Sequence, residues 1–417
     1  MKVRRHRRAV RSGVTVGVRL CRCGVAWHAT RRASGLLRVL SVDCVALGLV
    51  AAVLLVATPL TPNRAPAAPP ANFTDTLVVG GFSTIPTDVT AMADGRLLIT
   101  TQDGIVSTFK NGTKTTALNF ASRVCSNLER GIFGVALDPS FATTHYVYLS
   151  YSFNKHGMCV NNSPDSPVNR VSRFTYSTST NRIDAGREVV LLDNMPSSGG
   201  GHNVGDIAFA PDGTLIVSIG DESCDLTNGS KCGPQNTNAR RMNLLLGKIL
   251  RITRDGGIPA NNPYLGTGTA RCNVNGRTTA GTICREIYAT GFRNPFRFAV
   301  DPNITGLRVH ADDTGQNTWE EVDNVVAGGD YGWSVCEGRF QTGSISTDCP
   351  LGGATDPIFS YGHGDCNAIT GAAFVPNGIW PSAYDGKYLF AAFARRSIGE
   401  PRNDVDVGRS PVTLVQM

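Results

Sequence analysis

The most informative hydrophobic pattern lies in residues 287–333, where short apolar runs alternate with turns. Three of these runs are predicted to be strands: Ile287–Ala289, Phe296–Val300 and Leu307–Ala311. Gly291 breaks the first run, Asp301–Asn303 forms a turn after the second, and a polar loop, Asp312–Asn317, is expected after the third. Polar residues on loops between strands are a common way for a rigid sheet to present a site.

A unit made of an apolar run, a turn and a second apolar run recurs along the chain. The repeats are Val89–Gly104, Val135–Ser152, Ile207–Asp221, Phe298–Gly315 and Ala372–Ala392. Such a unit cannot bury both of its faces alone, so the repeats must pack against one another. The pattern predicts an all-β protein built as a β-propeller. A β-sandwich is the alternative, which the repeat number and chain length disfavour.

Three motifs follow in order: GFRNPFRFAVDP (Gly291–Pro302), DTGQNTWEEVD (Asp313–Asp323) and GGDYGW (Gly328–Trp333). Together they resemble the glucose/sorbosone dehydrogenase family, soluble sugar dehydrogenases that use pyrroloquinoline quinone (PQQ). The resemblance extends from about Phe73 to about Phe393. It implies a six-bladed β-propeller, PQQ and calcium as cofactors, and oxidation of an aldose to a lactone by hydride transfer to the quinone.

The resemblance also implies roles for single residues. His202, within Ser197–Asp206, matches the family's catalytic base, although Gly201 stands where the best-studied branch has Asp. Histidine is well suited to accept a proton near neutral pH, but a lone histidine in a loop is more often structural. Glu129 matches a substrate-binding position, and a surface ion pair with Arg130 is the alternative.

Arg293 and Asn294 match the pair that contacts PQQ, and the resemblance implies that Arg293 also stabilises charge developing on the quinone oxygen. A planar guanidinium can pair with and stack on an anionic, planar quinone. The alternative is that both residues only tie down a turn. Gly315 and Gln316 match positions whose backbone carbonyls bind calcium, a cation that favours oxygen ligands.

Other conspicuous residues near these motifs are given structural interpretations. Glu320, Glu321 and Asp323 are expected to form turn and strand-edge hydrogen bonds rather than to bind metal. Tyr331 and Trp333 line a cavity or pack a blade, and packing is the favoured interpretation for Trp333.

The amino-terminal region differs from the rest of the chain. Residues 1–70 hold 12 of the 40 basic residues and one of the 33 acidic ones, which leaves 28 basic and 32 acidic residues and a net charge of −4. This balance gives no electrostatic case for nucleic acid binding. The apolar run Cys44–Ala57 has 14 residues, fewer than the roughly 20 of a membrane-spanning helix. Residues 1–60 are therefore predicted to be a basic region with a signal peptide, with a membrane anchor as the alternative.

Residues 61–72 are rich in Pro and Ala and are predicted to form a linker before one large domain, 73–417. Residues 394–417 neither match the family nor show clear strand alternation. They are predicted to be an aberrant tail, with the last blade truncated or lacking. An incomplete blade would expose sheet edges.

Nine cysteines follow the linker, and in an exported protein they suggest disulfides. Short spacings predict the pairs Cys224–Cys232, Cys272–Cys284 and Cys336–Cys349. Cys125 and Cys159 form a candidate longer bridge, and Cys366 is left without a partner. No CxxC spacing of a zinc site is present.

The resemblance implies a PQQ- and calcium-dependent aldose dehydrogenase with an unidentified electron acceptor, and the amino-terminal region and cysteines predict that it is secreted or at the cell surface. No nucleic acid partner is expected, and membrane contact only through the amino-terminal anchor. The alternative is a non-catalytic, carbohydrate- or protein-binding propeller of the hedgehog-interacting type, which carries a similar GQNTWEEV loop. A metal-dependent lactonase would need clustered carboxylate or Asn ligands, for which the sequence offers no clear set.

Overall fold

The computed structural model describes residues 76–161, 167–223, 237–363, 366–394 and 412–416. The predicted signal or anchor region and the linker lie outside these residues, as does most of the tail. No helix within the described ranges is long and apolar enough to cross a membrane.

Four antiparallel sheets of four strands make up most of the described chain. The first contains β1 (Pro86–Ala91), β2 (Leu97–Thr101), β3 (Ile105–Lys110) and β4 (Thr113–Asn119). The second contains β5 (Ile132–Leu137), β6 (Tyr146–Phe153), β7 (Val168–Ser177) and β8 (Arg182–Pro196). The third contains β9 (Val204–Phe209), β10 (Thr214–Ile219), β11 (Lys248–Thr253) and β14 (Ile287–Thr290). The fourth contains β15 (Pro295–Val300), β16 (Val309–Asp313), β17 (Trp319–Val325) and β20 (Phe359–Gly362).

A fifth sheet has three strands, β21 (Cys366–Phe374), β22 (Tyr388–Ala394) and β23 (Val412–Gln416). The short elements are β12 (Thr269–Ala270), β13 (Ile283–Cys284), β18 (Cys336–Glu337), β19 (Phe340–Gln341), α1 (Phe141–Thr144), η1 (Asn238–Arg240) and η2 (Ser382–Tyr384). Strand β23 lies within the predicted tail and pairs antiparallel with β22, although residues 394–417 show no clear strand alternation in sequence. The β-branched and apolar residues of β23 suit a strand once a neighbouring strand is available.

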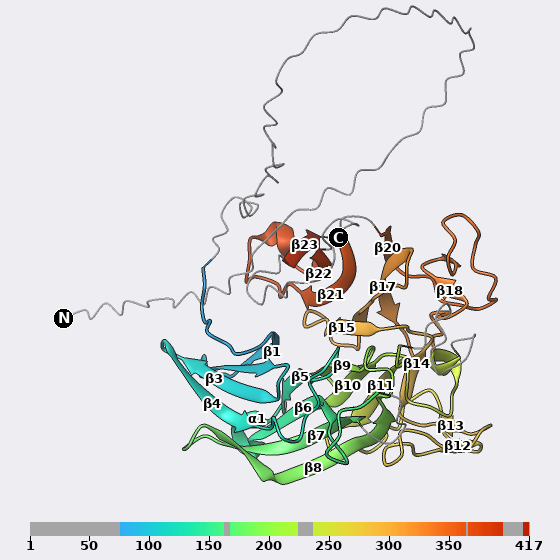
Figure 1. Cartoon of the computed structure of the whole chain (residues 1–417). Helices are drawn as coiled ribbons and strands as arrows, with labels where there is room; N and C mark the ends of the chain where they lie inside the picture. Colours follow the sequence, from blue (N-terminus) through green and yellow to red (C-terminus); the bar gives the residue numbers. More distant parts are fainter. Residues whose placement is uncertain (1–75, 162–166, 224–236, 364–365, 395–411, 417) are drawn as a thin grey trace, which may run out of the picture.

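The sheets follow one another in chain order, from blue β1–β4 to red β21–β23 (Figure 1). The first strand of each sheet is the innermost one: β1 packs against β5, β5 against β9, β9 against β15, and β15 against β21. Each predicted repeat supplies the first two strands of one sheet. This arrangement is an all-β propeller, so the β-sandwich alternative is wrong.

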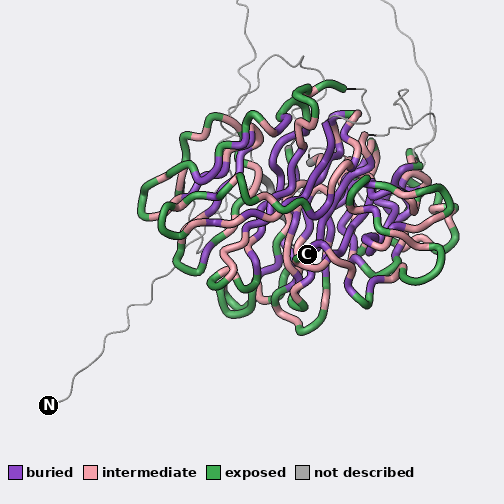
Figure 2. The backbone as a smooth tube through the Cα atoms, turned by 90° about the horizontal axis from the view of Figure 1, so that it is seen from below, coloured by how far each residue is buried: buried purple, intermediate pink, exposed green. Residues whose placement is uncertain are grey.

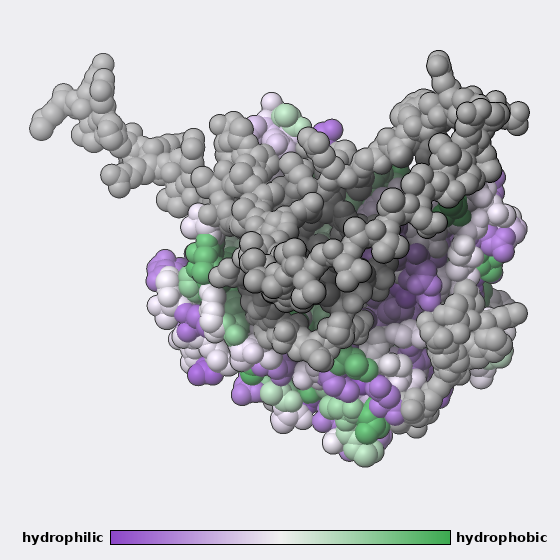
Figure 3. Space-filling model, turned by 45° about the horizontal axis from the view of Figure 1, so that its top comes forward, coloured by the Kyte–Doolittle hydropathy of each residue, from purple (hydrophilic) through white to green (hydrophobic). Residues whose placement is uncertain are grey.

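Four hydrophobic clusters each lie between two consecutive sheets. Strand β10 shows how the sequence produces this core. Its residues Leu215, Val217 and Ile219 pack toward the second sheet, whereas Ile216 packs toward the fourth. Successive side chains of a strand point to opposite faces, so a strand buried on both faces is a continuous apolar run. Figure 2 shows the buried backbone in the middle and exposed loops at the rim, and Figure 3 shows a mixed exterior with hydrophilic residues gathered beside the atoms drawn in grey.

The strands predicted within residues 287–333 are confirmed as β14, β15 and β16, with one correction. Asp312 and Asp313, expected in a polar loop, lie in β16 and pair with β17. Both side chains are buried, and the Tyr388 hydroxyl donates to Asp312 Oδ1 at 2.7 Å. The two polar side chains predicted a loop, because a local sequence pattern does not show the hydrogen-bond partners that a buried carboxyl group finds elsewhere in the fold.

Three disulfides connect Cys125 to Cys159, Cys272 to Cys284, and Cys336 to Cys349. These pairings confirm the predictions made for them. Cys224, Cys232 and the side chain of Cys366 lie outside the described residues. Cys272 and Cys284 also lie close to Glu286, but bonded sulfurs do not serve as metal ligands.

Replacing Cys125 and Cys159 together by Ser is expected to lower the free energy of unfolding by about 3–4 kcal/mol, because the bridge closes a loop of 34 residues. Urea unfolding monitored by circular dichroism measures the change. The matched control removes Cys272 and Cys284, which are 12 residues apart, and should cost about 1 kcal/mol less. An unchanged urea midpoint in the first variant would show that the long bridge does not constrain the unfolded chain.

Candidate functional site

His202 lies in a Gly-rich loop that leads into β9, the innermost strand of the third sheet. Its backbone is left-handed, with φ of 49°, and its N–H donates to Glu129 Oε2 at 2.9 Å. The preceding residue is tightly packed, because a β-carbon at Gly201 would lie 2.2 Å from Ser223 Oγ. An Asp at this position, as in the best-studied branch, would therefore require the Ser223 side chain to move.

Asp221, which follows β10, holds the imidazole of His202. Its Oδ1 lies 2.6 Å from His202 Nδ1 and also accepts the Ser223 N–H at 3.0 Å, while its Oδ2 accepts the Trp333 indole N–H at 2.7 Å. A carboxylate accepts hydrogen bonds, so Nδ1 carries the proton and Nε2 is left as the basic nitrogen. Both side chains are buried, with 8% of His202 and none of Asp221 exposed.

Glu129 and Arg130 lie at the entrance to β5 and do not form the surface ion pair considered above. Glu129 is exposed, whereas Arg130 is fully buried. The Arg130 guanidinium donates to Ser197 Oγ at 2.9 Å and Asn161 Oδ1 at 2.8 Å. Burial lowers the pKa of Arg130. Arg130 thus fixes the start of the His202 loop and leaves the Glu129 carboxylate at its surface.

Arg293 and Asn294 form the turn between β14 and β15. Their backbone N–H groups donate to the two oxygens of Asp313, at 2.8 Å and 2.6 Å. Burial raises the pKa of Asp313 to about 7, although these two hydrogen bonds oppose the shift. The backbone of the pair therefore ties down the turn, as the alternative interpretation expects.

The side chain of Arg293 reaches the loop that follows β16. Its Nε donates to Gln316 Oε1 at 3.0 Å, and its Nη1 donates to the carbonyl oxygens of Thr314 and Gly315 at 2.9 Å and 2.8 Å. The guanidinium carbon lies 5.5 Å from the centre of the Trp333 ring. Carbonyl oxygens thus converge on a positive charge beside an aromatic side chain.

One hydrogen bond joins the two halves of the site: the Asp221 N–H donates to the Arg293 carbonyl at 2.9 Å. The structure therefore brings together His202, Glu129, Arg293 and the Gly315–Gln316 loop, on loops from three different sheets. Trp333, interpreted as a packing residue, is indeed buried, but its indole N–H also contacts Asp221 within the site.

The acidic residues of β17 are not at a strand edge, because β17 lies between β16 and β20. Glu320 accepts the N–H groups of Ala368 at 2.8 Å and Ile369 at 3.0 Å, and Glu321 accepts one from the loop after β18. The interpretation of Glu320 and Glu321 as hydrogen-bonding groups is confirmed, but not their place at an edge. Neither carboxylate oxygen of Asp323 has a partner among the described residues.

Sequence reasoning missed two site residues, Asp221 and Glu337. A signal for Asp221 was present, because an acid directly follows the buried strand of the repeat that begins after His202. Glu337 is buried and accepts N–H groups from the loop after Gly315. No local pattern indicates this contact, which joins two segments about twenty residues apart.

Comparison with known proteins finds related sequences and related folds. The model of the family described as Glucose / Sorbosone dehydrogenase matches residues 83–410. The match continues past Phe393, where the motif resemblance was expected to end.

Two curated relatives differ in what their names describe. Quinoprotein glucose dehydrogenase B of Acinetobacter calcoaceticus is 30% identical over 213 residues, which are 49% of this chain and 40% of that protein. Hedgehog-interacting protein of Mus musculus is 25% identical over 210 residues, 49% of this chain and 28% of that protein. The chain spans less than half the length of either relative.

Among solved structures, the PQQ-bound form of aldose sugar dehydrogenase from Streptomyces coelicolor has a TM-score of 0.55. It is 24% identical, and the alignment covers 75% of each chain. This similarity shows a shared fold.

Proposed function

Because the chain belongs to the glucose/sorbosone dehydrogenase family, we propose that it oxidises aldose sugars to lactones with PQQ and calcium. The observation that carries the proposal is the His202–Asp221 pair, joined by a hydrogen bond to Arg293. A base, its orienting carboxylate and a cationic group for an anionic cofactor thus meet in one place. The exposed Glu129 carboxylate lies beside them for contact with sugar hydroxyls.

The residues around Arg293 fit an anionic, planar cofactor. Arg293 is half-buried, and Gln316 and two backbone carbonyls fix the direction of its guanidinium. A guanidinium held in this way can pair with carboxylates and stack on a planar ring. We assign cofactor binding to Arg293 and Asn294.

The loop after β16 fits calcium in its donor chemistry. The carbonyls of Thr314 and Gly315 converge on a positive charge, and calcium favours such backbone oxygens in irregular loops. The carbonyl oxygens of Gly315 and Gln316 would hold the ion.

When bound, PQQ supplies the hydride acceptor and calcium polarises its reactive carbonyl. His202 Nε2 accepts the proton of the anomeric hydroxyl as hydride leaves the same sugar carbon. Asp221 keeps the proton on Nδ1 and stabilises the imidazolium that forms. Arg293 stabilises negative charge that develops on the cofactor. The two electrons would then pass to an external acceptor.

The direct test mixes purified protein with PQQ, calcium and single aldoses and follows reduction of an artificial dye. The proposal expects dye reduction that depends on the aldose and disappears without PQQ or with a calcium chelator. Absence of both PQQ binding and aldose-dependent reduction would favour the non-catalytic alternative below.

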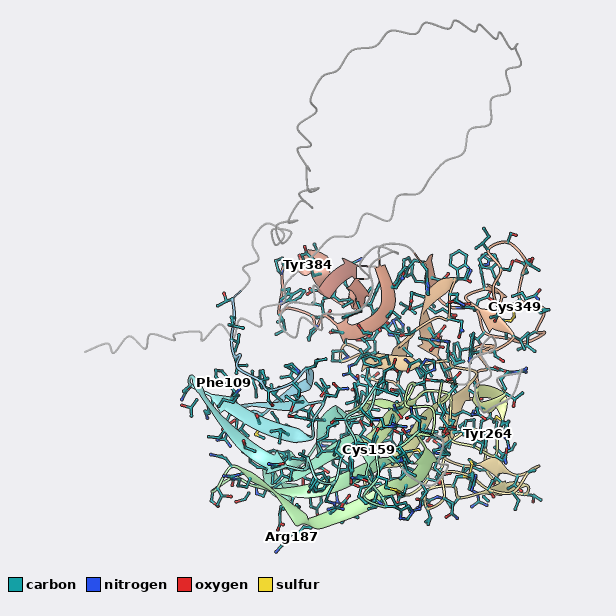
Figure 4. The ribbon with its side chains drawn as sticks, in the orientation of Figure 1. Phe109, Cys159, Arg187, Tyr264, Cys349 and Tyr384 are labelled. Atoms are coloured by element: carbon teal, nitrogen blue, oxygen red, sulfur yellow. A yellow bond between two sulfur atoms is a disulfide. The ribbon has the colours of Figure 1, made fainter. Side chains whose placement is uncertain are left out.

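Arg293→Ala is expected to weaken PQQ binding about 10- to 100-fold and to lower turnover, because a charge-assisted contact to the cofactor is lost. Quenching of tryptophan fluorescence during titration with PQQ measures the affinity. Arg187→Ala is the matched control, since Arg187 lies exposed on β8, at the lower rim in Figure 4. Equal affinities in Arg293→Ala and the control would remove Arg293 from the cofactor site.

A non-catalytic binding propeller of the hedgehog-interacting type is the second candidate. Its support is Gly201, which stands where the best-studied branch has an Asp before its histidine, together with the relationship to a hedgehog-interacting protein. This candidate expects no PQQ binding in the titration described above.

We further propose that the complete propeller has six blades and that the protein is exported. The four complete sheets, the three-stranded sheet and the shared fold with a PQQ-bound dehydrogenase support the first proposal. The three disulfides support the second, because such bridges persist in oxidising compartments.

A further inference from the structure

A single carboxylate oxygen organises the loop that follows β16. Glu337, in β18, is 1% exposed. Its Oε1 accepts N–H groups from four consecutive residues, Gln316, Asn317, Thr318 and Trp319, at 2.9, 3.0, 2.8 and 3.0 Å. Successive N–H groups that converge in this way form an anion-binding nest. Here the chain fills the nest with its own carboxylate.

The tight curvature of the loop requires glycine at position 315. A β-carbon on Gly315 would lie 1.6 Å from the Trp319 carbonyl oxygen and 2.9 Å from Glu337 Oε1. Both contacts are shorter than any β-carbon tolerates, and the first is to backbone. Gly315 therefore lets the loop close around the carboxylate.

Glu337 is itself held rigidly from outside the sheet. Cys336, next to it, is bonded to Cys349, which Figure 4 shows on the outer loop beside β18. Glu337 pairs with Phe340 in the β18–β19 hairpin, and the Phe340 ring stacks on Trp319 with centroids 5.0 Å apart. The disulfide and the hairpin thus hold the carboxylate, and the stacked rings join the hairpin to the loop that it binds.

The direction of the N–H groups determines the direction of the carbonyl groups. In a trans peptide the C=O of one residue points opposite to the N–H of the next. Because the N–H groups of residues 316–319 point at Glu337, the carbonyls of residues 315–318 point away from it. Gly315 O follows this rule, since it accepts a hydrogen bond from Arg293 Nη1.

We propose that Glu337 is a positioning residue that turns the carbonyls of Gly315 and Gln316 toward the calcium site. The inference rests on the proposed function, because it concerns the ion that this function requires. Glu337 does not touch the ion. It acts by fixing the loop, and a carboxylate is needed because a charged acceptor binds four N–H groups more strongly than a neutral one.

The test measures the calcium concentration that gives half-maximal PQQ binding, followed by tryptophan fluorescence, with no turnover involved. Glu337→Ala is expected to raise this concentration about 10- to 100-fold, the usual effect of losing a residue that orients metal ligands. Glu337→Gln keeps an acceptor oxygen without the charge and should give a smaller rise, of at least about threefold. Hydrogen exchange at residues 316–319 should become faster in the same order.

Glu286→Ala is the matched control, because Glu286 is also fully buried, accepts a backbone N–H from Cys272 at 3.0 Å and lies beside a disulfide. Glu286→Ala should lower the free energy of unfolding without changing the calcium concentration that gives half-maximal PQQ binding. If Glu337→Ala does not fold, the test uses Glu337→Gln. A calcium concentration for half-maximal PQQ binding equal to that of the wild type in Glu337→Gln would overturn the inference. If the wild-type protein binds PQQ with an affinity that does not depend on calcium, both the proposed calcium site and this inference are wrong.

Discussion

His202→Ala is expected to lower turnover with aldoses by about 10²- to 10⁴-fold and to leave PQQ affinity nearly unchanged. The reason is the division of contacts in the site. His202 is bonded to Asp221 through Nδ1 and offers Nε2 to a substrate proton, whereas the groups assigned to the cofactor are on Arg293 and its loop. Steady-state dye reduction and PQQ titration measure the two effects separately.

A second variant tests whether Asp221 acts through His202. Asp221→Asn places an amide N–H where Oδ1 accepts from Nδ1, which favours the wrong tautomer of the imidazole. Turnover should fall at least about tenfold, whereas adding Asp221→Asn to His202→Ala should lower it little further, because Asp221 acts only through the imidazole. His156→Ala is the control, since this exposed histidine lies on the loop after β6. Wild-type turnover in His202→Ala would show that another group accepts the proton.

The free energy of unfolding of the calcium-free protein is expected to fall by about 4 kcal/mol or more as pH rises from about 4 to 7. Burial raises the pKa of Asp313 from 3.8 to about 7 and also raises the pKa values of Asp312, Glu321 and Asp323. Between these pH values the folded protein retains a proton that the unfolded chain has released, so a rising pH favours unfolding. A shift of about three pKa units at Asp313 alone corresponds to about 4 kcal/mol.

Urea unfolding in a chelating buffer at several pH values measures this dependence. Asp323→Asn should raise stability at pH 8 and flatten the curve, because it removes an ionisable group whose oxygens have no partner in the described part of the chain. Asp94→Asn is the control: Asp94 is exposed, and its Lys110 partner lowers its pKa, so it should change the slope little between pH 5 and 8. Stability that stays constant or rises from pH 4.5 to 7 would show that these carboxyl groups are compensated inside the fold.

Much of the propeller could be predicted because its strands repeat a local pattern. Each repeat of an apolar run and a turn, such as Ile207–Asp221, contains a strand that is buried on both faces of its sheet. Because every blade needs such strands, the same apolar pattern recurs. The polar residues of β16 followed no such pattern. Asp312 looks like a loop residue until Tyr388, from another sheet, donates a hydrogen bond to it.

Only those site residues that lie within a recognisable sequence motif could be predicted. Arg293 and Gly315 lie within motifs, and the structure brings their atoms within 2.8 Å. A surface ion pair was the alternative considered for Arg130, because nothing in its neighbourhood shows that Ser197 and Asn161 enclose it. Its partners are 67 and 31 residues away in sequence, so propensity and spacing carry no information about them.

Contacts between distant sheets of the propeller are also expected to affect the rate of folding. The Trp333 indole reaches Asp221 across 112 residues, and the Arg297 guanidinium reaches the Thr87 carbonyl across 210. Contacts this distant form only after the intervening chain has lost much of its freedom, which slows folding. Individual blades can gain their hairpins early, because consecutive strands are neighbours. The hydrogen bond from Trp333 to Asp221 is therefore expected to form late during refolding, after far-ultraviolet dichroism has largely recovered, whereas the His202–Asp221 pair lies within one sheet.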